Sequence, residues 1–152
     1  MEIRTKKRRI GLGVRGGPYA HMALRRKAKA IVKVTERSAE AKQEVLYSLP
    51  GIFAMELREG KYVVRLIKEG DCLRMMENTE ASDILLTVTF SDIDAEKGSL
   101  VGKVSMGRLL AEGRITYKGR CKYFNAFQRI SYIADKTLLS TKKFQAMYGT
   151  EN

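Results

Sequence analysis

The alternation of apolar and polar side chains is the feature that most constrains the fold of this chain. In residues 53–58, the apolar Phe53, Met55 and Leu57 alternate with smaller or charged residues. Residues 62–67 follow after a Glu-Gly-Lys turn, and residues 84–90 place four large apolar side chains on one side of the backbone. A period of two predicts β-strands, half-buried at residues 53–58 and apolar on both faces at residues 62–67. Residues 72–76 and the glycine-bracketed residues 113–119 predict two further strands.

Helices are predicted before and after these strands. Residues 21–48 contain no Gly or Pro and carry apolar residues near helical spacing, so we expect one long helix or two helices that break near Ser38. Leu49-Pro50-Gly51 ends this region. Apolar residues at helical spacing in 123–133 and 138–148 predict two C-terminal helices. This order of elements favours an α+β fold in which helices cover one face of a sheet.

Positive charge is concentrated at the N-terminus. The formal net charge is +12, and residues 1–33 hold eleven Lys or Arg against one acid. We therefore expect a basic leader and helix start at residues 1–35, followed by one domain at residues 36–152. Such an arm is attracted to nucleic acid or to an anionic membrane, and it also promotes solubility. The candidate residues for an anionic surface are Lys6, Lys7, Arg8, Arg9, Arg25, Arg26 and Lys27.

The leader contains a G-x-G-x-x-G pattern at residues 11–16. A dinucleotide-binding loop of this type follows a buried strand and opens a helix. Here the preceding residues 5–10 are mostly basic, and Gly17-Pro18 follows the pattern. The context therefore excludes a dinucleotide site and favours a glycine-rich leader.

The sequence contains few residues that could form a catalytic or metal-binding site. The chain has one histidine, His21, and its two cysteines, Cys72 and Cys121, belong to no C-x-x-C pair. A metal site or a Ser-His-Asp device needs more ligands or a better-placed base. The acids Asp83, Asp92, Asp94 and Glu112 are scattered and are interpreted as turn or cap residues. We therefore expect no cofactor and no enzymatic activity. Because no apolar run suits a membrane span or a secretion signal, we also expect an intracellular, cytoplasmic protein.

Residues 49–70, 81–92 and 102–119 together resemble the sterol carrier protein type 2 family. In that family, a strand that opens on a small residue and Asp leads through a helical connection to a G-[KR]-I-x-x-x-G strand. Residues 81–90 are similar to the first strand and residues 113–119 to the second. The resemblance covers about residues 40–135. The chain differs from the family at Arg120 and in its basic leader, and it ends in Gly-Thr-Glu-Asn rather than a peroxisomal Ser-Lys-Leu.

The resemblance implies a five-stranded mixed sheet with helices on one face, enclosing an apolar tunnel that carries lipids. The sheet wall of that tunnel would comprise Met55, Leu57, Val64, Leu66, Leu86, Val88, Ile115 and Tyr117. The helical wall would comprise Met106, Leu109, Leu110, Phe124, Phe127 and Ile130. Apolar residues at these spacings more often form an ordinary packed core than a ligand-binding wall.

Two other functions remain open at this level. The basic arm could bind nucleic acid or an anionic surface, although the strands offer no paired exposed aromatic residues for base stacking. Domains of the resembled family also act as accessory assembly modules, so a dimer is a further possibility. The identity of an apolar ligand cannot be predicted, because apolar tunnels discriminate by shape and length.

Overall fold

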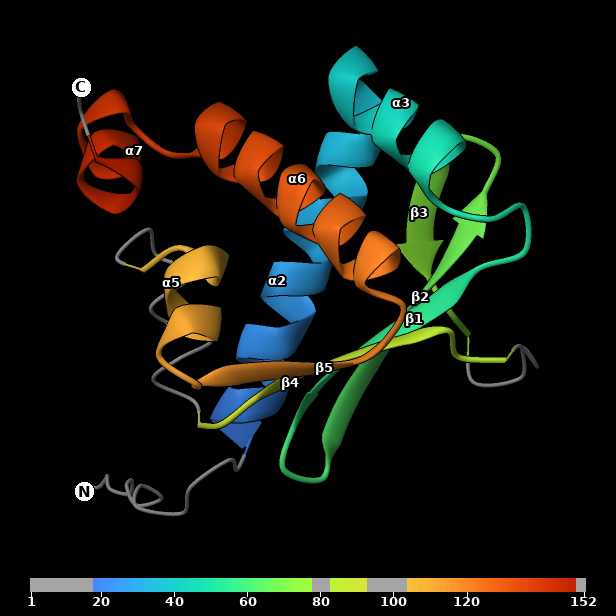
Figure 1. The fold of residues 1–152 in the computed structure, drawn as a ribbon, viewed down its shortest axis with the longest axis horizontal. Helices are drawn as coiled ribbons and strands as arrows, with labels where there is room; N and C mark the ends of the chain where they lie inside the picture. The colour runs from blue at the N-terminus through green and yellow to red at the C-terminus, as the bar shows by residue number, and fades with distance from the viewer. Residues whose placement is uncertain (1–17, 78–82, 93–103, 150–152) are drawn as a thin grey trace, which may run out of the picture.

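The computed structural model describes residues 18–77, 83–92 and 104–149. Two helices come first, α2 (Pro18–Arg37) and α3 (Ala39–Ser48), and three strands follow, β1 (Ala54–Glu59), β2 (Tyr62–Glu69) and β3 (Cys72–Met75). Next come β4 (Leu86–Phe90), the short helix α5 (Met106–Ala111) and β5 (Ile115–Gly119). The helices α6 (Cys121–Leu138) and α7 (Thr141–Tyr148) complete the order (Figure 1). The leader at residues 1–17, with Lys6 to Arg9 and the glycine pattern, lies outside the described residues, as does Asp94.

The five strands form one mixed sheet in the order β3-β2-β1-β4-β5. β1 runs parallel to β4, and the other neighbouring pairs are antiparallel. The register aligns Val64, Leu57, Val88 and Tyr117 in one row across four strands. Because side chains alternate along each strand, this row lies on a single face of the sheet. The α+β fold with a five-stranded mixed sheet is thereby confirmed.

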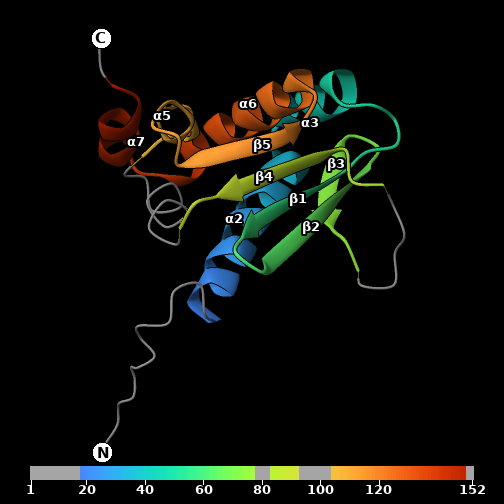
Figure 2. The same cartoon turned by 60° about the horizontal axis from the view of Figure 1, so that its bottom comes forward.

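The helices α2, α3 and α6 lie together on that face (Figure 2). α2 packs against β1, β2 and β3, while α6 packs against α2, α3, β4 and β5. The core between the two layers is apolar and includes Leu24, Ile31, Leu57 and Phe127, each at most 2% exposed. Burial of this shared apolar layer is the main stabilising contribution that the sheet and helices make to each other.

Of the two expected alternatives, one long helix or two helices, the structure has two, and the break between α2 and α3 falls at Ser38. The Ser38 hydroxyl oxygen accepts a hydrogen bond from the Ala41 backbone N–H at 3.1 Å, which caps the first turn of α3. The domain boundary expected at residue 35 falls inside α2. α2 extends to Arg37 and buries Leu24, Ala28 and Ile31 in the common core, so the helix belongs to the same folded unit as the sheet. The sequence-based division followed charge, but the cations of this helix do not mark a separate unit, because its apolar side belongs to the common core and Lys27 is buried as well.

Candidate functional site

The predicted tunnel residues lie in the apolar layer between sheet and helices. On the sheet side, Met55, Leu57, Val64, Leu66, Leu86, Val88 and Ile115 are at most 5% exposed, and Tyr117 is partly buried. On the helical side, Met106, Leu109, Phe124, Phe127 and Ile130 are at most 2% exposed, and Leu110 is partly buried. All fourteen belong to, or pack against, one hydrophobic cluster. The fold thus brings both predicted walls together, and their contact with a ligand stays a prediction.

Aromatic contacts join the two walls at the start of α6. The rings of Tyr117 on β5 and Phe124 on α6 are stacked, with centroids 4.2 Å apart and an interplanar angle of 6°. Phe53, just before β1, meets Tyr123 edge to face at 5.5 Å. These pairs fix the first turn of α6 on the sheet at two points.

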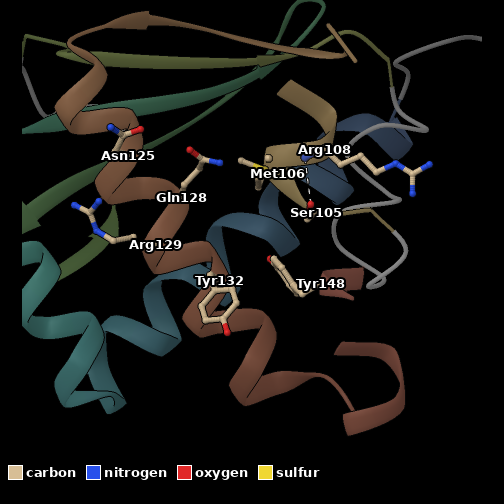
Figure 3. Close-up of a pocket in the computed structure, with 9 residues that line it drawn as sticks. Ser105, Met106, Arg108, Asn125, Gln128, Arg129, Tyr132 and Tyr148 are labelled. Carbon is tan, nitrogen blue, oxygen red and sulfur yellow. Dashed lines mark hydrogen bonds between the residues drawn. The ribbon is translucent and has the colours of Figure 1, made fainter. Parts of the chain in front are cut away.

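A cavity of about 490 Å³ lies among α5, α6 and α7. Met106 lies at its boundary with the core, and the amide of Gln128 points toward Met106 (Figure 3). The Arg108 and Arg129 side chains extend outward (Figure 3). Arg108 Nε pairs with Glu112 Oε2 at 3.0 Å, and Arg129 Nε pairs with Glu44 Oε1 at 2.7 Å. The remaining lining residues are Ser105, Gly107, Asn125, Tyr132 and Tyr148. The lining is therefore mixed: it joins neutral amide, hydroxyl and thioether groups to two arginines that are paired with acids.

A second cavity, of about 240 Å³, lies between α2 and the C-terminal part of α6. Lys27 and Asp135 line it together with apolar side chains. The Lys27 ammonium donates a hydrogen bond to the Ser131 hydroxyl at 3.2 Å, and the Tyr148 hydroxyl donates one to Asp135 Oδ2 at 2.5 Å. Together these four residues form a buried polar cluster that ties α2, α6 and α7 together.

Burial shifts the proton affinities in this cluster. It lowers the pKa of Lys27 below its usual range, and the nearby Asp135 carboxyl opposes this effect. Burial likewise raises the pKa of Asp135, opposed by Lys27 and by the Tyr148 hydroxyl. Burial and the bond to Asp135 raise the pKa of Tyr148.

The burial of Lys27 differs from the expectation that placed it on an anionic surface with Arg25 and Arg26. Lys27 is 3% exposed and points toward α6, whereas Arg25 and Arg26 are exposed. Sequence reasoning also missed Ser131 and Asp135. Their one-turn spacing beside the apolar stripe of α6 is the signal that could have identified them.

A basic stripe follows the exposed side of α2. Arg25, Lys29, Lys33 and Arg37 recur at every fourth position, which places them on one side of the helix, and all four are exposed. Their side chains make no ion pair with any residue that the structure describes. Together with Arg26 and the buried Lys27, this stripe makes up the described cations of the basic N-terminal region.

Two searches bear on other kinds of site. Within residues 18–77, 83–92 and 104–149, no three His, Cys, Asp or Glu side chains gather closely enough to hold a metal ion. None of the helices in these ranges is both long enough and apolar enough to cross a membrane.

Comparison with known proteins identifies the fold. A scan against family models and a search of curated proteins found no match. Among solved structures, the sterol carrier protein domain 2 of Helicoverpa armigera matches with a TM-score of 0.52 at 16% identity, over 84% of this chain and 99% of that chain. The UbiJ-SCP2 ubiquinone synthesis protein matches with a TM-score of 0.52 at 13% identity, over 77% of this chain and 99% of that chain. Palmitated SCP2L2 from Aedes aegypti matches with a TM-score of 0.50 at 12% identity, over 71% of this chain and 93% of that chain.

These neighbours are matched over 93–99% of their own length, although only 12–16% of the residues are identical. The mixed sheet, its strand order and the helical layer on one face account for the match. This chain therefore has the sterol carrier protein 2 fold.

Proposed function

We propose that this protein binds and carries a lipid or another apolar molecule between the sheet and the helices, without forming a covalent bond to it. The observation that carries the proposal is the chemistry of the two facing walls. Thirteen of their fourteen predicted residues are purely aliphatic, thioether or phenyl side chains, and the remaining one is Tyr117. Such walls bind through desolvation and dispersion, which suits an alkyl chain or a fused ring system.

Two further observations support a carrier. Met55 and Met106 stand on opposite walls, and methionine adapts to ligands of different shape because its side chain is unbranched and polarizable. One structural neighbour, SCP2L2 of Aedes aegypti, was solved in a palmitated form. A fatty acid is therefore a reasonable first probe.

Extraction of the purified protein with organic solvent, followed by mass spectrometry, tests the proposal directly. We expect a lipid to co-purify, and we expect a fluorescent fatty-acid analogue to bind at micromolar concentration. A protein that releases no lipid and leaves the analogue free at that concentration is not a carrier of this kind.

Enlarging one wall residue locates the ligand. Val88 is fully buried at the centre of β4, and Val88→Phe adds volume where the ligand is proposed to lie. We expect Val88→Phe to lower the capacity for the fatty-acid analogue. The matched control is Val45→Phe, because Val45 is equally buried but belongs to α3 and to neither proposed wall. In the control, overpacking costs about 1–3 kcal/mol of stability and leaves the capacity of the folded protein unchanged.

A second candidate function is docking onto an anionic surface through the basic stripe of α2. Four exposed cations without ion pairs among the described residues favour it, and the leader residues Lys6 to Arg9 would extend it. Replacing Arg25, Lys29, Lys33 and Arg37 by Gln is expected to weaken binding to anionic vesicles and to reduce its salt dependence. If the same change instead abolishes a gel shift with RNA, and vesicle binding persists, the stripe serves nucleic acid.

A further inference from the structure

An exposed apolar tip lies at the end of the molecule away from α7. It consists of Leu46 and Tyr47 on the last turn of α3 and of Ile52 in the following loop, and these side chains are 46%, 76% and 87% exposed. Residues 45–55 contain no charged side chain. Ile52 projects outward although the next residue, Phe53, is buried at 2% exposure. The apolar surface of this tip is left in water, so covering it is favourable.

A basic corner lies beside the tip, where β5 turns into α6. It consists of Lys118, Arg120 and Lys122, all of which are exposed. Residues 113–134 include five Lys or Arg and no acid. In the part of the chain that the structure describes, the side chains of the corner form no ion pair. The corner therefore presents three exposed cations that have no ion-pair partner among the described residues.

Phe53 and Tyr123 link the tip to the corner, because each is the chain neighbour of one of the two regions and their rings are in contact. The Phe53 ring, adjacent to Ile52, meets the Tyr123 ring edge to face at 5.5 Å. The Arg120 guanidinium lies over the same Tyr123 ring, 5.6 Å from its centroid. In addition, the Lys68 ammonium donates a hydrogen bond to the Leu49 carbonyl oxygen at 3.0 Å, which fixes the loop on β2. In Figures 1 and 2 the α3–β1 loop and the β5–α6 turn both lie on the side of the molecule away from α7, with the loop further out.

We propose that this end of the protein docks onto the surface of a lipid bilayer that contains anionic lipids. Ile52 and Tyr47 enter the boundary between headgroups and acyl chains, while Lys118, Arg120 and Lys122 lie among the lipid phosphates. A bilayer surface offers negative charge directly above an apolar layer, which matches cations placed beside an apolar tip. The surface is distinct from the basic stripe of α2.

Other partners match this surface less well. A nucleic acid would pair with the three cations but would leave Ile52 in water. A stable protein partner needs about 800 Å² of contact on each side, whereas the tip offers only three protruding side chains. Docking does not depend on what the interior binds, so this proposal is independent of the carrier function. If the protein is a carrier, docking would bring it into contact with the membrane.

Vesicle binding by the full-length protein tests the proposal. The probes are vesicles of phosphatidylcholine with and without phosphatidylglycerol, and binding is measured by co-sedimentation. Replacing Lys118, Arg120 and Lys122 by Gln is expected to weaken binding to the anionic vesicles about 100-fold at low salt, since each cation near such a surface contributes roughly fivefold. Ile52→Ser removes an apolar side chain from the interface and is expected to weaken binding about tenfold. Because all four residues are exposed, the thermal unfolding of the Ile52→Ser variant should match that of the wild type, and the corner variant should unfold at most slightly earlier, through loss of the Arg120–Tyr123 contact.

Matched controls lie at the opposite end of the molecule. Replacing Lys136, Lys142 and Lys143 by Gln removes the same charge from exposed positions on α6 and α7. Leu138→Ser removes an apolar side chain that is 44% exposed. Both controls should bind vesicles within about twofold of the wild type. The proposal is overturned if the corner variant binds as well as its control. It is also overturned if the corner variant loses RNA binding but keeps vesicle binding.

Contact between the basic corner and the vesicle surface can be measured directly at Cys121, which is exposed and lies between Arg120 and Lys122. In a Cys72→Ala protein, Cys121 is the one remaining thiol in the sequence and can carry an environment-sensitive fluorophore. Its emission should shift to the blue on addition of anionic vesicles and stay unchanged with phosphatidylcholine alone. If the emission is unchanged on anionic vesicles that bind the protein, the docking face lies elsewhere.

Discussion

At the scale of single residues, the Lys27–Asp135 pair is the most unusual feature of the interior. Both are at most 6% exposed, and Asp135 also accepts the hydrogen bond from Tyr148. Removing one charge of a buried pair leaves the other without its counter-charge, which costs more than removing both. Lys27→Met and Asp135→Asn should therefore each destabilise the fold, and the double variant should cost at least about 1 kcal/mol less than their sum. Urea unfolding of the four proteins measures this difference, and strictly additive costs would show that the pair is not coupled.

Glu56 predicts a pH dependence on the other face of the sheet. Arg58 and Arg65 donate hydrogen bonds to its carboxylate at 2.8 Å and 3.0 Å. Burial raises the pKa of Glu56, but these two guanidinium groups outweigh burial and hold the pKa below its ordinary value of 4.5. On acidification, Glu56 binds a proton in the unfolded chain at a higher pH than in the folded protein. The stability that ionised Glu56 contributes is therefore fully present above the ordinary pKa of 4.5 and is lost as the pH falls through the lowered pKa of the folded state.

We therefore expect the free energy of unfolding to fall more steeply in the wild type than in Glu56→Gln between about pH 5 and about pH 3. At neutral pH the same variant should be about 1–3 kcal/mol less stable, because it loses two charge-assisted hydrogen bonds. Glu40→Gln, at an exposed position in the first turn of α3, is the control and should keep the wild-type slope. If the free energy of unfolding falls with pH equally steeply in Glu56→Gln and in the wild type, Glu56 is not the source of the pH dependence.

At the scale of elements, the turn from β5 into α6 depends on Gly119. Its φ of 135° lies in a region that other residues rarely adopt, and a Cβ added there would collide with the Leu85 carbonyl oxygen. Gly119→Ala should thus lower the free energy of unfolding by more than about 2 kcal/mol, since both strain and a backbone clash result. Gly113→Ala is the matched control. Its φ of 72° is also positive, but its Cβ would meet open space, and about 1 kcal/mol is expected. If chemical denaturation shows that Gly119→Ala and Gly113→Ala lose the same free energy of unfolding, the backbone clash at Gly119 has no energetic effect.

Most elements could be predicted from local pattern. Alternation along β1 and β4 indicated which residues face the helices, whereas β2 is apolar on both faces and needed its register with β1. Ser38 was the expected position of a helix break because capping chemistry is local. The environment of Lys27 could not be predicted, because its partner Ser131 is 104 positions away and a cation on a basic helix is normally exposed. The cavity among α5, α6 and α7 was missed for the same reason, since three separate segments create it.

At the scale of the whole molecule, charge and apolar surface are arranged on separate regions. The apolar layer lies between sheet and helices, the basic stripe follows α2, and the apolar tip with its basic corner lies at the start of α6. Proposed ligand binding and proposed membrane docking therefore use different residues. Variants of one region should leave the function of the other intact, which makes the two proposals separable.

Ligand-linked stability tests that separation on the intact protein. A ligand that binds only the folded state raises the free energy of unfolding by about 2.7 kcal/mol at a concentration 100 times its Kd. We expect a fatty acid to stabilise the wild type by an amount of this order, as measured by urea unfolding with and without ligand. Val88→Phe should lose most of this gain, because Val88 lies inside the apolar layer. Ile52→Ser should keep all of it, because Ile52 is 87% exposed on the tip. If Ile52→Ser loses the gain while Val88→Phe keeps it, the fatty acid binds at the surface of the tip and the interior is a packed core.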